Sequence, residues 1–508
     1  MPRVISSEQM KRLDSRTINE YGIPSRTLME NAGTGCFRYL QEHHRQELAG
    51  GIALLCGYGN NGGDGFVIAY QLQAAGYPVT ILEVGTGKSS EETLANRNRC
   101  LQCGIPVLTV RKDNLETEVA SCLKGQKVII DAIYGIGFRG SLEGTVADLV
   151  RLVNSLEALK VAVDIASGLN ADTGLTGLAF RADVTLTMAA LKTGHLIGEG
   201  KACSGRTVVI PIGIPDALWE QEQCGVLSGE NDIVMPVRNR YSHKGDYGRI
   251  AVFAGSEGFT GAAFMASLAA LRAGAGLVTI HSHPAQAPLY YHKPYEVMWT
   301  DIPLARDGSP DGKTLFDKLA RTEVILFGPG SGTGEFTAQV LFLILRYWDK
   351  PAVLDADGLN LLSTHPEWYK YLNNKPFVLT PHWGEFCRLA GIRMEDLTRE
   401  VLFHLTSFVH THKVAVLLKS HTSIYYDGKH LIYNTTGNDG LAKGGSGDLL
   451  AGLLTSFLAQ GLARDKAAQA AAWWLGKTAE RLAQARKAFS ILPEDILSQL
   501  FVEDGSLS

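Results

Sequence analysis

The sequence predicts an α/β protein of two domains, each with a mostly parallel sheet covered by helices. The chain has 508 residues, and a single hydrophobic core rarely grows beyond about 250 to 300 residues. Short apolar runs alternate with amphipathic stretches, which is typical of consecutive βαβ units. The alternation stops at a polar stretch near residues 216–245, which prolines punctuate, and then restarts. We therefore expect one domain in residues 1–222 and another in residues 223–508.

The composition is that of an ordinary globular protein. The 48 basic and 52 acidic side chains give a formal net charge of −4, so neither a nucleic acid nor an anionic membrane is indicated as a partner. The chain lacks both an apolar run of the roughly 18 residues that a membrane span needs and the apolar core of a signal peptide, so we expect a cytosolic protein. Glycine is the outlier at 55 residues, against an average usage of about 7%.

The first domain is expected to begin with two helices between residues 6 and 45. Strands are then expected in the apolar runs IALLC, PVTILEV, KVIIDA, VAVDI, VTLTM and TVVIPI. The stretches between them, the first of which is FVIAYQLQAAG, would form helices on both faces of the sheet. This arrangement is a Rossmann-like domain of three layers.

A glycine loop, Gly57–Gly65, follows the strand IALLC directly. Its sequence matches the G-x-G-x-x-G dinucleotide fingerprint, and Glu83 ends the next strand about 20 residues later, which taken alone favours a dehydrogenase. The loop is more polar than that fingerprint needs. Its polar residues would either cap the following helix or line a binding site at this sheet edge; they are Asn60, Asn61 and Asp64.

Two further strands of the first domain end in carboxylates. Asp131 and Asp164 end these strands, and Ser167 follows the second by three residues. A single Asp after a strand is more often a turn former than a catalyst. With Asp64, however, three carboxylates converge on the same sheet edge, which indicates acid–base catalysis or binding of a cation.

The motifs NNGGDG, LMENAG, DAIYGIG and VAVDIASGLNADTG resemble, as a set, those of the NAD(P)H-hydrate epimerase family over essentially the whole first domain. The resemblance implies that Asp64 and Asp164 are catalytic and that Asn61, Asp131 and Ser167 hold K⁺. It also implies a set of residues around a hydrated nicotinamide nucleotide. These are Asn60, Asn61, Gly62, Gly63, Asp64, Gly135, Ile136, Gly137, Phe138, Arg139, Gly140, Ser141 and Asp164.

The second domain repeats the alternation with different loops. Strands are expected in RIAVF, GLVTIHS, EVILF, PAVLD, FVLT, VAVLL and TSIYYD, with a helix through FMASLAALRAG and two long helices near the C-terminus. Asp355 and Asp357, in LDADGLN, are suited to assist Mg²⁺ through water. His382, between a strand and a helix, is a candidate substrate contact, although a lone histidine is more often structural.

A second glycine loop, Gly437–Asp448, precedes the apolar helix LLAGLLTSFLAQG. Gly444, Gly445 and Gly447 leave consecutive N–H groups free at a helix N-terminus, which makes a cradle for phosphoryl oxygens. Asp448 then lies in the first helical turn, where it can orient or deprotonate a hydroxyl group. This G-x-G-D pattern is typical of ribokinase-like kinases; the alternative is that Asp448 only caps the helix.

The motifs FTGAA, YEVM, GPGSG, DADGLN, TPHWGE and GNDGLAKGGSGD resemble those of the ADP-dependent NAD(P)H-hydrate dehydratase family, a branch of the ribokinase-like fold, over nearly all of the second domain. By that resemblance Asp448 is the catalytic base. The residues implied to contact the hydrated nucleotide are Ala262, Gly330, His382 and Asp448. Those implied to hold the adenine nucleotide are Lys419, Ser420, His421, Thr422, Ser423, Gly444, Gly445 and Gly447. The family has glycine where Ser420 stands, so its backbone should avoid positive φ or carry strain.

Both resemblances imply repair of one damaged metabolite, NADH or NADPH with water added across the 5,6 double bond of the nicotinamide ring. The first domain would interconvert the two C6 epimers with K⁺ bound. The second would dehydrate the S epimer with Mg²⁺, using ADP as cosubstrate and giving AMP and phosphate. We also expect a homo-oligomer. Two alternatives stay open, a small-molecule kinase and a first domain that serves only for binding or dimerisation.

Overall fold

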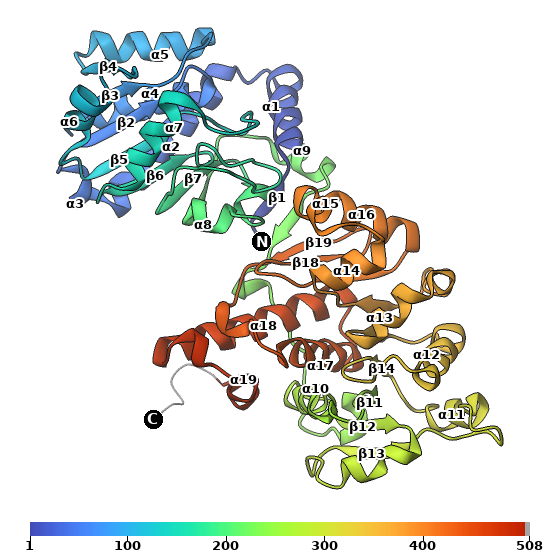
Figure 1. The fold of residues 1–508 in the computed structure, drawn as a ribbon. Coiled ribbons are helices and arrows are strands. Elements are labelled where there is room, and N and C mark those ends of the chain that lie inside the picture. The colour runs from blue at the N-terminus through green and yellow to red at the C-terminus, as the bar shows by residue number, and fades with distance from the viewer. Residues whose placement is uncertain (503–508) are drawn as a thin grey trace. The chain divides into compact units, whose positions relative to one another are not determined.

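The computed structural model describes residues 1–502 and divides into two compact units (Figure 1). The N-terminal unit holds Pro2–Gly225, and the C-terminal unit begins at Val226. The expected domain boundary at residue 222 lies just before this division.

The N-terminal unit alternates strands and helices as its sequence predicts. Its strands are β1 (Arg3–Ile5), β2 (Ile52–Cys56), β3 (Val79–Glu83), β4 (Val107–Thr109), β5 (Val128–Ala132), β6 (Leu159–Val163), β7 (Val184–Met188), β8 (Leu191–Lys192) and β9 (Arg206–Ile210). Its helices are α1 (Ser7–Tyr21), α2 (Ser25–His43), α3 (Arg45–Leu48), α4 (Asn60–Ala74), α5 (Glu91–Gln102), α6 (Ala120–Leu123), α7 (Gly144–Asn154), α8 (Gly200–Ser204) and α9 (Asp216–Gln221).

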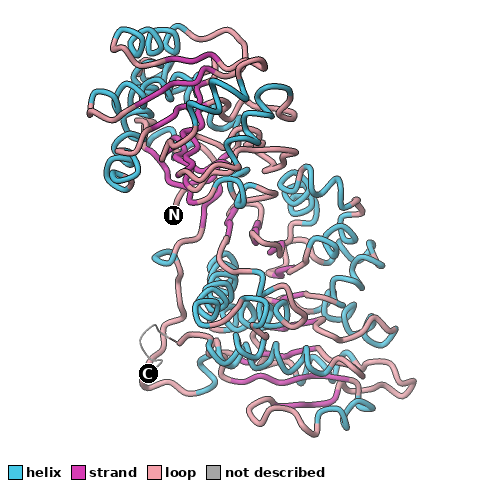
Figure 2. Tube along the Cα trace, turned by 60° about the vertical axis from the view of Figure 1, so that its left-hand side comes forward, coloured by secondary structure: helices cyan, strands magenta, loops and turns pink. Residues whose placement is uncertain are grey.

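The main sheet of this unit has the strand order β4-β3-β2-β5-β6-β7-β9, with every neighbouring pair parallel. Successive side chains of a strand point to opposite faces, and both faces are covered. Leu54 packs in one core with residues of α1, α2 and α4. Leu55 packs in the other core with residues of α6 and α7. In Figure 2 the helices of this unit accordingly lie on both sides of its strands.

The C-terminal unit also alternates strands and helices. Its strands are β10 (Gly225–Leu227), β11 (Arg249–Phe253), β12 (Leu277–Ser282), β13 (Met298–Asp301), β14 (Val324–Phe327), β15 (Ala352–Leu354), β16 (Phe377–Leu379), β17 (Ala415–Leu418), β18 (Ser423–Tyr426) and β19 (Leu431–Asn434). Its helices are α10 (Thr260–Arg272), α11 (Gly312–Lys318), α12 (Glu335–Tyr347), α13 (Asp357–Thr364), α14 (Trp383–Ala390), α15 (Met394–Arg399), α16 (Val401–His412), α17 (Ser446–Ala459), α18 (Arg464–Ala485) and α19 (Pro493–Gln499).

The strands of this unit follow the order β13-β12-β11-β14-β15-β16-β17-β18-β19-β10. They are parallel from β13 to β17 and antiparallel from β17 to β19. Helices α10, α17, α18 and α19 pack in one core against alternate strand residues such as Val252 and Leu326. Figure 1 shows α12, α13 and α14 on the other side of the sheet. The predicted α/β class is confirmed in both units.

Helix α4 begins at Asn60, so the first glycine loop is shorter than the sequence suggests. Residues 60–65 of the predicted loop 57–65 therefore form more than one turn of α4. The polar residues of the motif, Asn60, Asn61 and Asp64, belong to this helix. Among the described residues, no helix is long and apolar enough to cross a membrane.

Candidate functional site

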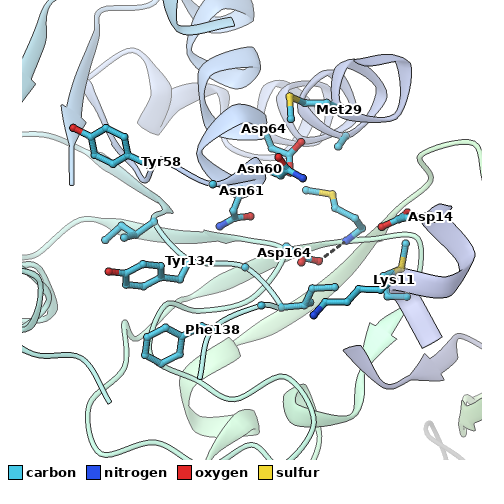
Figure 3. Close-up of a pocket in the computed structure, with 18 of the residues that line it drawn as sticks. Lys11, Asp14, Met29, Tyr58, Asn60, Asn61, Asp64, Tyr134, Phe138 and Asp164 are labelled. Atoms are coloured by element: carbon cyan, nitrogen blue, oxygen red, sulfur yellow. Dashed lines mark hydrogen bonds between the residues drawn. The ribbon is translucent and has the colours of Figure 1, made fainter. Parts of the chain in front are cut away.

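A cavity of about 800 Å³ opens at the carboxyl ends of β2, β5 and β6 in the N-terminal unit (Figure 3). Its walls come from α1, α2, the start of α4, the segments after β3, β5 and β6, and β8. This is the sheet edge at which parallel α/β proteins bind their ligands, and the volume suits a nucleotide-sized molecule. Figure 3 shows Asp14, Asp64 and Asp164 toward one end of the cavity, with Tyr58, Tyr134 and Phe138 toward the other.

The first turns of α4 come close to the neighbouring backbone, which explains the glycines there. A Cβ atom at Gly62 would lie 1.9 Å from the carbonyl oxygen of Gly57. A Cβ atom at Gly63 would lie 2.6 Å from the side chain of Met29. These two glycines are buried and do not line the cavity, so their role is to let α4 approach its neighbours closely.

The polar residues of this turn do not cap the helix. The N-cap of α4 is Gly59, and no side chain makes a capping hydrogen bond there. Asn60, Asn61 and Asp64 instead line the cavity. The amide oxygen and nitrogen of Asn61 are buried without a hydrogen-bond partner in the described part of the chain. The capping alternative is therefore wrong for these residues.

The surroundings of Asp64 favour its neutral form. Burial raises its pKa well above the ordinary value, and the nearby carboxylates of Asp164 and Asp14 raise the pKa further. The ammonium group of Lys192 acts in the opposite direction and does not outweigh them. This shift favours the protonated carboxyl group, which can donate a proton.

Asp164 is held in its ionised form by a buried ion pair. Lys192 is fully buried, and its Nζ lies 2.5 Å from Oδ1 of Asp164. Burial would raise the pKa of Asp164, but the charge and hydrogen bond of Lys192 keep it below the ordinary value. Lys192 Nζ also donates to the hydroxyl of Thr187 at 2.9 Å and to the carbonyl of Met188 at 2.8 Å.

The backbone at Asp164 is unusual. Its φ is 65°, in the left-handed region that residues other than glycine seldom adopt. His195 helps to hold this conformation, because its Nε2 lies 3.1 Å from the carbonyl oxygen of Asp164 while its Nδ1 accepts from Lys192 N. Burial lowers the pKa of His195 to about 4, so the ring is neutral and Nε2 carries the hydrogen.

Asp131 is fully buried and does not line the cavity. Its carboxylate accepts hydrogen bonds from the backbone N–H and the hydroxyl of Ser167, both at 2.7 Å, and from Ile133 N at 3.1 Å. Burial outweighs these bonds and raises the pKa of Asp131 to about 6. The pair fastens the segment after β6 to the end of β5.

The structure brings most of the predicted epimerase residues to this cavity, but not all of them. Those that line it are Asn60, Asn61, Asp64, Gly135, Ile136, Gly137, Phe138, Arg139 and Asp164. Those that do not are Gly62, Gly63, Gly140 and Ser141, together with the predicted K⁺ ligands Asp131 and Ser167.

The second group of predicted residues gathers at the carboxyl edge of the C-terminal sheet, around Asp448 in the first turn of α17. No side chain caps this helix, whose N-cap Gly445 has φ 103°. Burial raises the pKa of Asp448 to about 7; the neighbouring Asp355 raises it further and Lys419 opposes the rise. The group is thus poised to gain or lose a proton near neutral pH, and the capping alternative is wrong here too.

Lys419 connects the carboxylates of this site. Its Nζ lies 2.6 Å from Oδ1 of Asp355 and 3.9 Å from Oε2 of Glu385. Burial would lower the pKa of Lys419, but Asp355 and Glu385 raise it above the ordinary value, so it stays charged. A Cβ atom at Gly447 would lie 3.4 Å from Lys419 Nζ, which places the glycine cradle directly beside this cation.

The predicted substrate contacts of this unit come from the first turn of α10, which holds Ala262, from the loop after β14, which holds Gly330, and from the N-cap of α14, His382. A Cβ atom at Gly330 would be 3.2 Å from that of Ala262, so these two residues adjoin. The backbone of His382 forms an isolated parallel β-bridge with that of Lys419, just after the ends of β16 and β17. Its Nδ1 accepts from Gly384 N at 3.0 Å, which gives it a structural capping role as well, while its side chain remains 56% exposed.

The remaining loop residues refine the predicted nucleotide site. Ser420 avoids positive φ as expected, and its hydroxyl donates to the carbonyl of Thr422 at 2.8 Å. Lys443 does not point into the glycine cradle, because its Nζ donates to the carbonyl of Phe489 at 2.6 Å. It anchors the loop. Asp357 accepts from Gly332 N at 2.9 Å and orders the loop that carries Gly330.

Sequence reasoning missed Lys192 and Asp14. Lys192 stands alone in an otherwise apolar run after β7, and a buried lysine in such a run is a usable signal because it needs a carboxylate partner. Asp14 lies on α1, far along the chain from the glycine motifs. Nothing in the spacing of α1 distinguishes it from an exposed acidic residue.

Two family models match the chain. One, described as NAD(P)H-hydrate dehydratase, matches residues 250–501. The other, described as YjeF-related protein N-terminus, matches residues 25–194. Among solved structures, an ADP/ATP-dependent NAD(P)H-hydrate dehydratase from Bacillus subtilis, co-crystallised with ATP and Mg²⁺, is 29% identical; the match covers 52% of this chain and 92% of that one, with a TM-score of 0.44.

Curated relatives match along nearly the whole length, and the three that follow are named bifunctional NAD(P)H-hydrate repair enzyme Nnr. The relative from Moorella thermoacetica is 32% identical over 98% of this chain and 96% of its own. The relative from Salinibacter ruber is 34% identical over 98% and 95%. The relative from Escherichia coli is 32% identical over 97% and 92%.

Proposed function

The chain belongs to the family of bifunctional NAD(P)H-hydrate repair enzymes, and we propose that its two halves divide the activities. Residues 1–222 would carry the epimerase and residues 223–508 the ADP-dependent dehydratase, in line with the two family models. The observation that supports this division most is that each unit has its own cluster of perturbed carboxylates at a sheet edge.

In the epimerase half, the hydrated nicotinamide would lie at the end of the cavity where Asp64 and Asp164 meet. The C6 carbon of this ring bears a hydroxyl group next to the ring nitrogen N1. Inversion at C6 needs a base for the hydroxyl proton and an acid for N1, and a cluster with both protonated and ionised carboxyls supplies both kinds of group. The stacked rings of Tyr134 and Phe138, 5.0 Å apart, offer an apolar surface at the other end for a base of the nucleotide.

In the dehydratase half, Asp448 would accept the proton of the C6 hydroxyl group. The oxygen of this hydroxyl group would attack the β-phosphorus of ADP, and AMP would leave. The N–H groups of the loop before α17 and the ammonium of Lys419 would stabilise the charge on the transferred phosphoryl group. The C6–O bond then breaks, phosphate departs, and loss of a proton from C5 restores the ring double bond. Phosphate leaves far more readily than hydroxide, so a kinase-like site can drive this elimination.

Two metal ions belong to the proposal. A K⁺ ion would be held by oxygens of Asn61, Asp131 and Ser167, where it would supply positive charge next to a buried carboxylate. The unpartnered amide oxygen of Asn61 supports this ligand set. For Mg²⁺, no group of three or more His, Cys, Asp or Glu side chains among residues 1–502 could hold a metal ion. We therefore assign Mg²⁺ to the phosphates of ADP, with Asp355 and Asp357 assisting through water.

The experiment that tests the division mixes separated R and S hydrates of NADH with the protein, with and without ADP. The epimer ratio follows the first activity, and recovery of dihydronicotinamide absorbance follows the second. We expect interconversion without ADP, and recovery of NADH only when ADP is present. Accumulation of a stable phosphorylated product without NADH would instead establish the small-molecule kinase, and an unchanged epimer ratio would leave the first domain noncatalytic.

Potassium removal gives a separate prediction. Replacing K⁺ by tetramethylammonium, which is too large for a site built from three side chains, is expected to slow epimerisation and to leave dehydration of the S hydrate unchanged. Asn61→Ala should slow epimerisation in K⁺ and remove the difference between the two cations. Equal epimerisation rates of the unaltered protein in both salts would contradict the K⁺ assignment.

The cytosolic location and the homo-oligomer stay predictions.

A further inference from the structure

Asp14 is a carboxyl group of the epimerase cavity that the proposed mechanism has not used. Helix α1 presents Met10, Asp14 and Ile18 to the cavity, at the spacing that places side chains on one helical face. Figure 3 shows the Asp14 carboxyl pointing from α1 toward the same end of the cavity as Asp64 and Asp164. It thus reaches the end of the cavity where the hydrated ring would lie.

The carboxyl of Asp14 is not tied into the protein. Its Oδ1 atom is buried and has no hydrogen-bond partner among the described residues. Asp164 and Asp131 differ in this respect, because Asp164 is bound to Lys192 and Asp131 to Ser167. Leaving a buried polar atom unpaired costs free energy, so natural structures rarely keep one without a functional reason.

The charged groups that face Asp14 come from four elements. They are Lys11 on α1, Asp64 on α4, Asp164 after β6 and Lys192 on β8. Burial raises the pKa of Asp14 to about 6; Lys192 opposes the rise and Asp164 adds to it. Lys192 is already paired with Asp164. The pKa of Asp14 therefore lies at about 6, whereas the pKa of Asp64 is raised well above its ordinary value.

We propose that Asp14 is a catalytic residue of the epimerase, exchanging a proton with the C6 hydroxyl of the hydrated ring while Asp64 exchanges one with N1. This inference rests on the proposed epimerase function of the N-terminal unit. It assigns the base and the acid to carboxyls on two different helices, α1 and α4, and leaves the Asp164–Lys192 pair to fix the electrostatic environment of both.

The reaction balances with these groups alone. Asp14 takes the proton of the C6 hydroxyl, a C6=O bond forms, and the C6–N1 bond breaks with its electron pair moving to N1, which takes the proton of Asp64. Rotation about the C5–C6 bond turns the aldehyde over. N1 then attacks the opposite face of C6 as its proton returns to Asp64, and the oxygen recovers its proton from Asp14. The product is the other epimer, and both carboxyls regain their starting states.

The test compares Asp14→Asn with Glu8→Gln in the full chain. Glu8 is an exposed acidic residue on the same helix and does not line the cavity, so its variant controls for a lost charge on α1. Conversion of the R into the S hydrate is followed over a range of pH without ADP, after subtraction of the enzyme-free rate. Dehydration of the S hydrate with ADP, measured on the same samples, reports whether the rest of the chain is intact.

We expect Asp14→Asn to slow epimerisation by about 10²-fold or more, the usual contribution of a general acid–base residue. The fall in kcat/KM on the acid side of the unaltered protein, near pH 6, should be absent from the residual activity of the variant, while Glu8→Gln keeps both rate and profile. Asp14→Glu should restore part of the rate. An Asp14→Asn variant within about threefold of the unaltered rate, or one that keeps the acid limb, overturns the inference. If the unaltered protein itself does not interconvert the epimers, the proposed function has failed instead.

Discussion

Replacing Asp448 by asparagine is expected to abolish ADP-dependent recovery of NADH while leaving epimerisation unchanged. Asparagine keeps the shape of the side chain but cannot accept the hydroxyl proton, and removal of a general base costs about 10² to 10⁴-fold in rate. The rate of NADH formation from the S hydrate with ADP measures the first effect, and the epimer ratio without ADP measures the second. Asp439→Asn is the matched control, because Asp439 is an exposed residue of the same glycine loop.

The pH dependence gives this prediction a second measurement. Asp448 acts in its ionised form, and burial raises its pKa to about 7, so kcat/KM for dehydration should fall as the pH drops below about 7. Lys419 is the group that lowers this pKa. Lys419→Met should therefore move the acid limb to higher pH in addition to weakening nucleotide binding. Recovery of NADH by Asp448→Asn at the unaltered rate would remove Asp448 from its role as base.

The sequence predicted the sheets and their functional edges well, because both depend on local patterns. Apolar runs such as IALLC at Ile52–Cys56 became strands, and the loops after them lie at one edge because the strands are parallel. The convergence of Asp64 and Asp164 follows from that rule alone. The length of the first glycine loop was predicted wrongly, since Asn60 already begins α4. Glycines rarely favour a helix, and here close approach to Gly57 rather than helix propensity determines the conformation.

The protonation states could not be predicted from sequence, because they depend on distances between elements remote along the chain. Asp64 and Asp164 have the same side chain but opposite pKa shifts, since only Asp164 contacts Lys192. Asp14 reaches the cavity only because α1 packs against the sheet edge of the same unit. Each of these assignments requires the folded arrangement of α1, α4 and β8.

Lys192→Met is expected to lower both epimerisation and the stability of the N-terminal unit. Methionine fills much of the same volume, but it leaves the carboxylate of Asp164 buried without its cation and the hydroxyl of Thr187 without its donor. Breaking a buried ion pair on one side costs about 3 to 5 kcal/mol. The pKa of Asp164 should then rise, so the carboxyl becomes neutral and the electrostatic balance at Asp64 and Asp14 changes.

Hydrogen exchange of peptides from the N-terminal sheet would measure the loss of stability within this unit, and ADP-dependent dehydration of the S hydrate would report the C-terminal unit separately.

The double variant Asp164→Asn with Lys192→Met removes both charges. Asp164→Asn and Lys192→Met each leave one buried charge without its partner. If this is why the single variants are harmful, the double variant should recover a large part of the lost stability, since the effects of substitutions at contacting residues are not additive. Epimerisation should not recover with it, because the cavity then lacks both the Asp164 carboxylate, which raises the pKa of Asp64 and of Asp14, and the Lys192 ammonium group, which lowers both. Restored stability with restored epimerisation would mean that the pair serves folding alone, whereas restored stability without activity separates its structural from its electrostatic role.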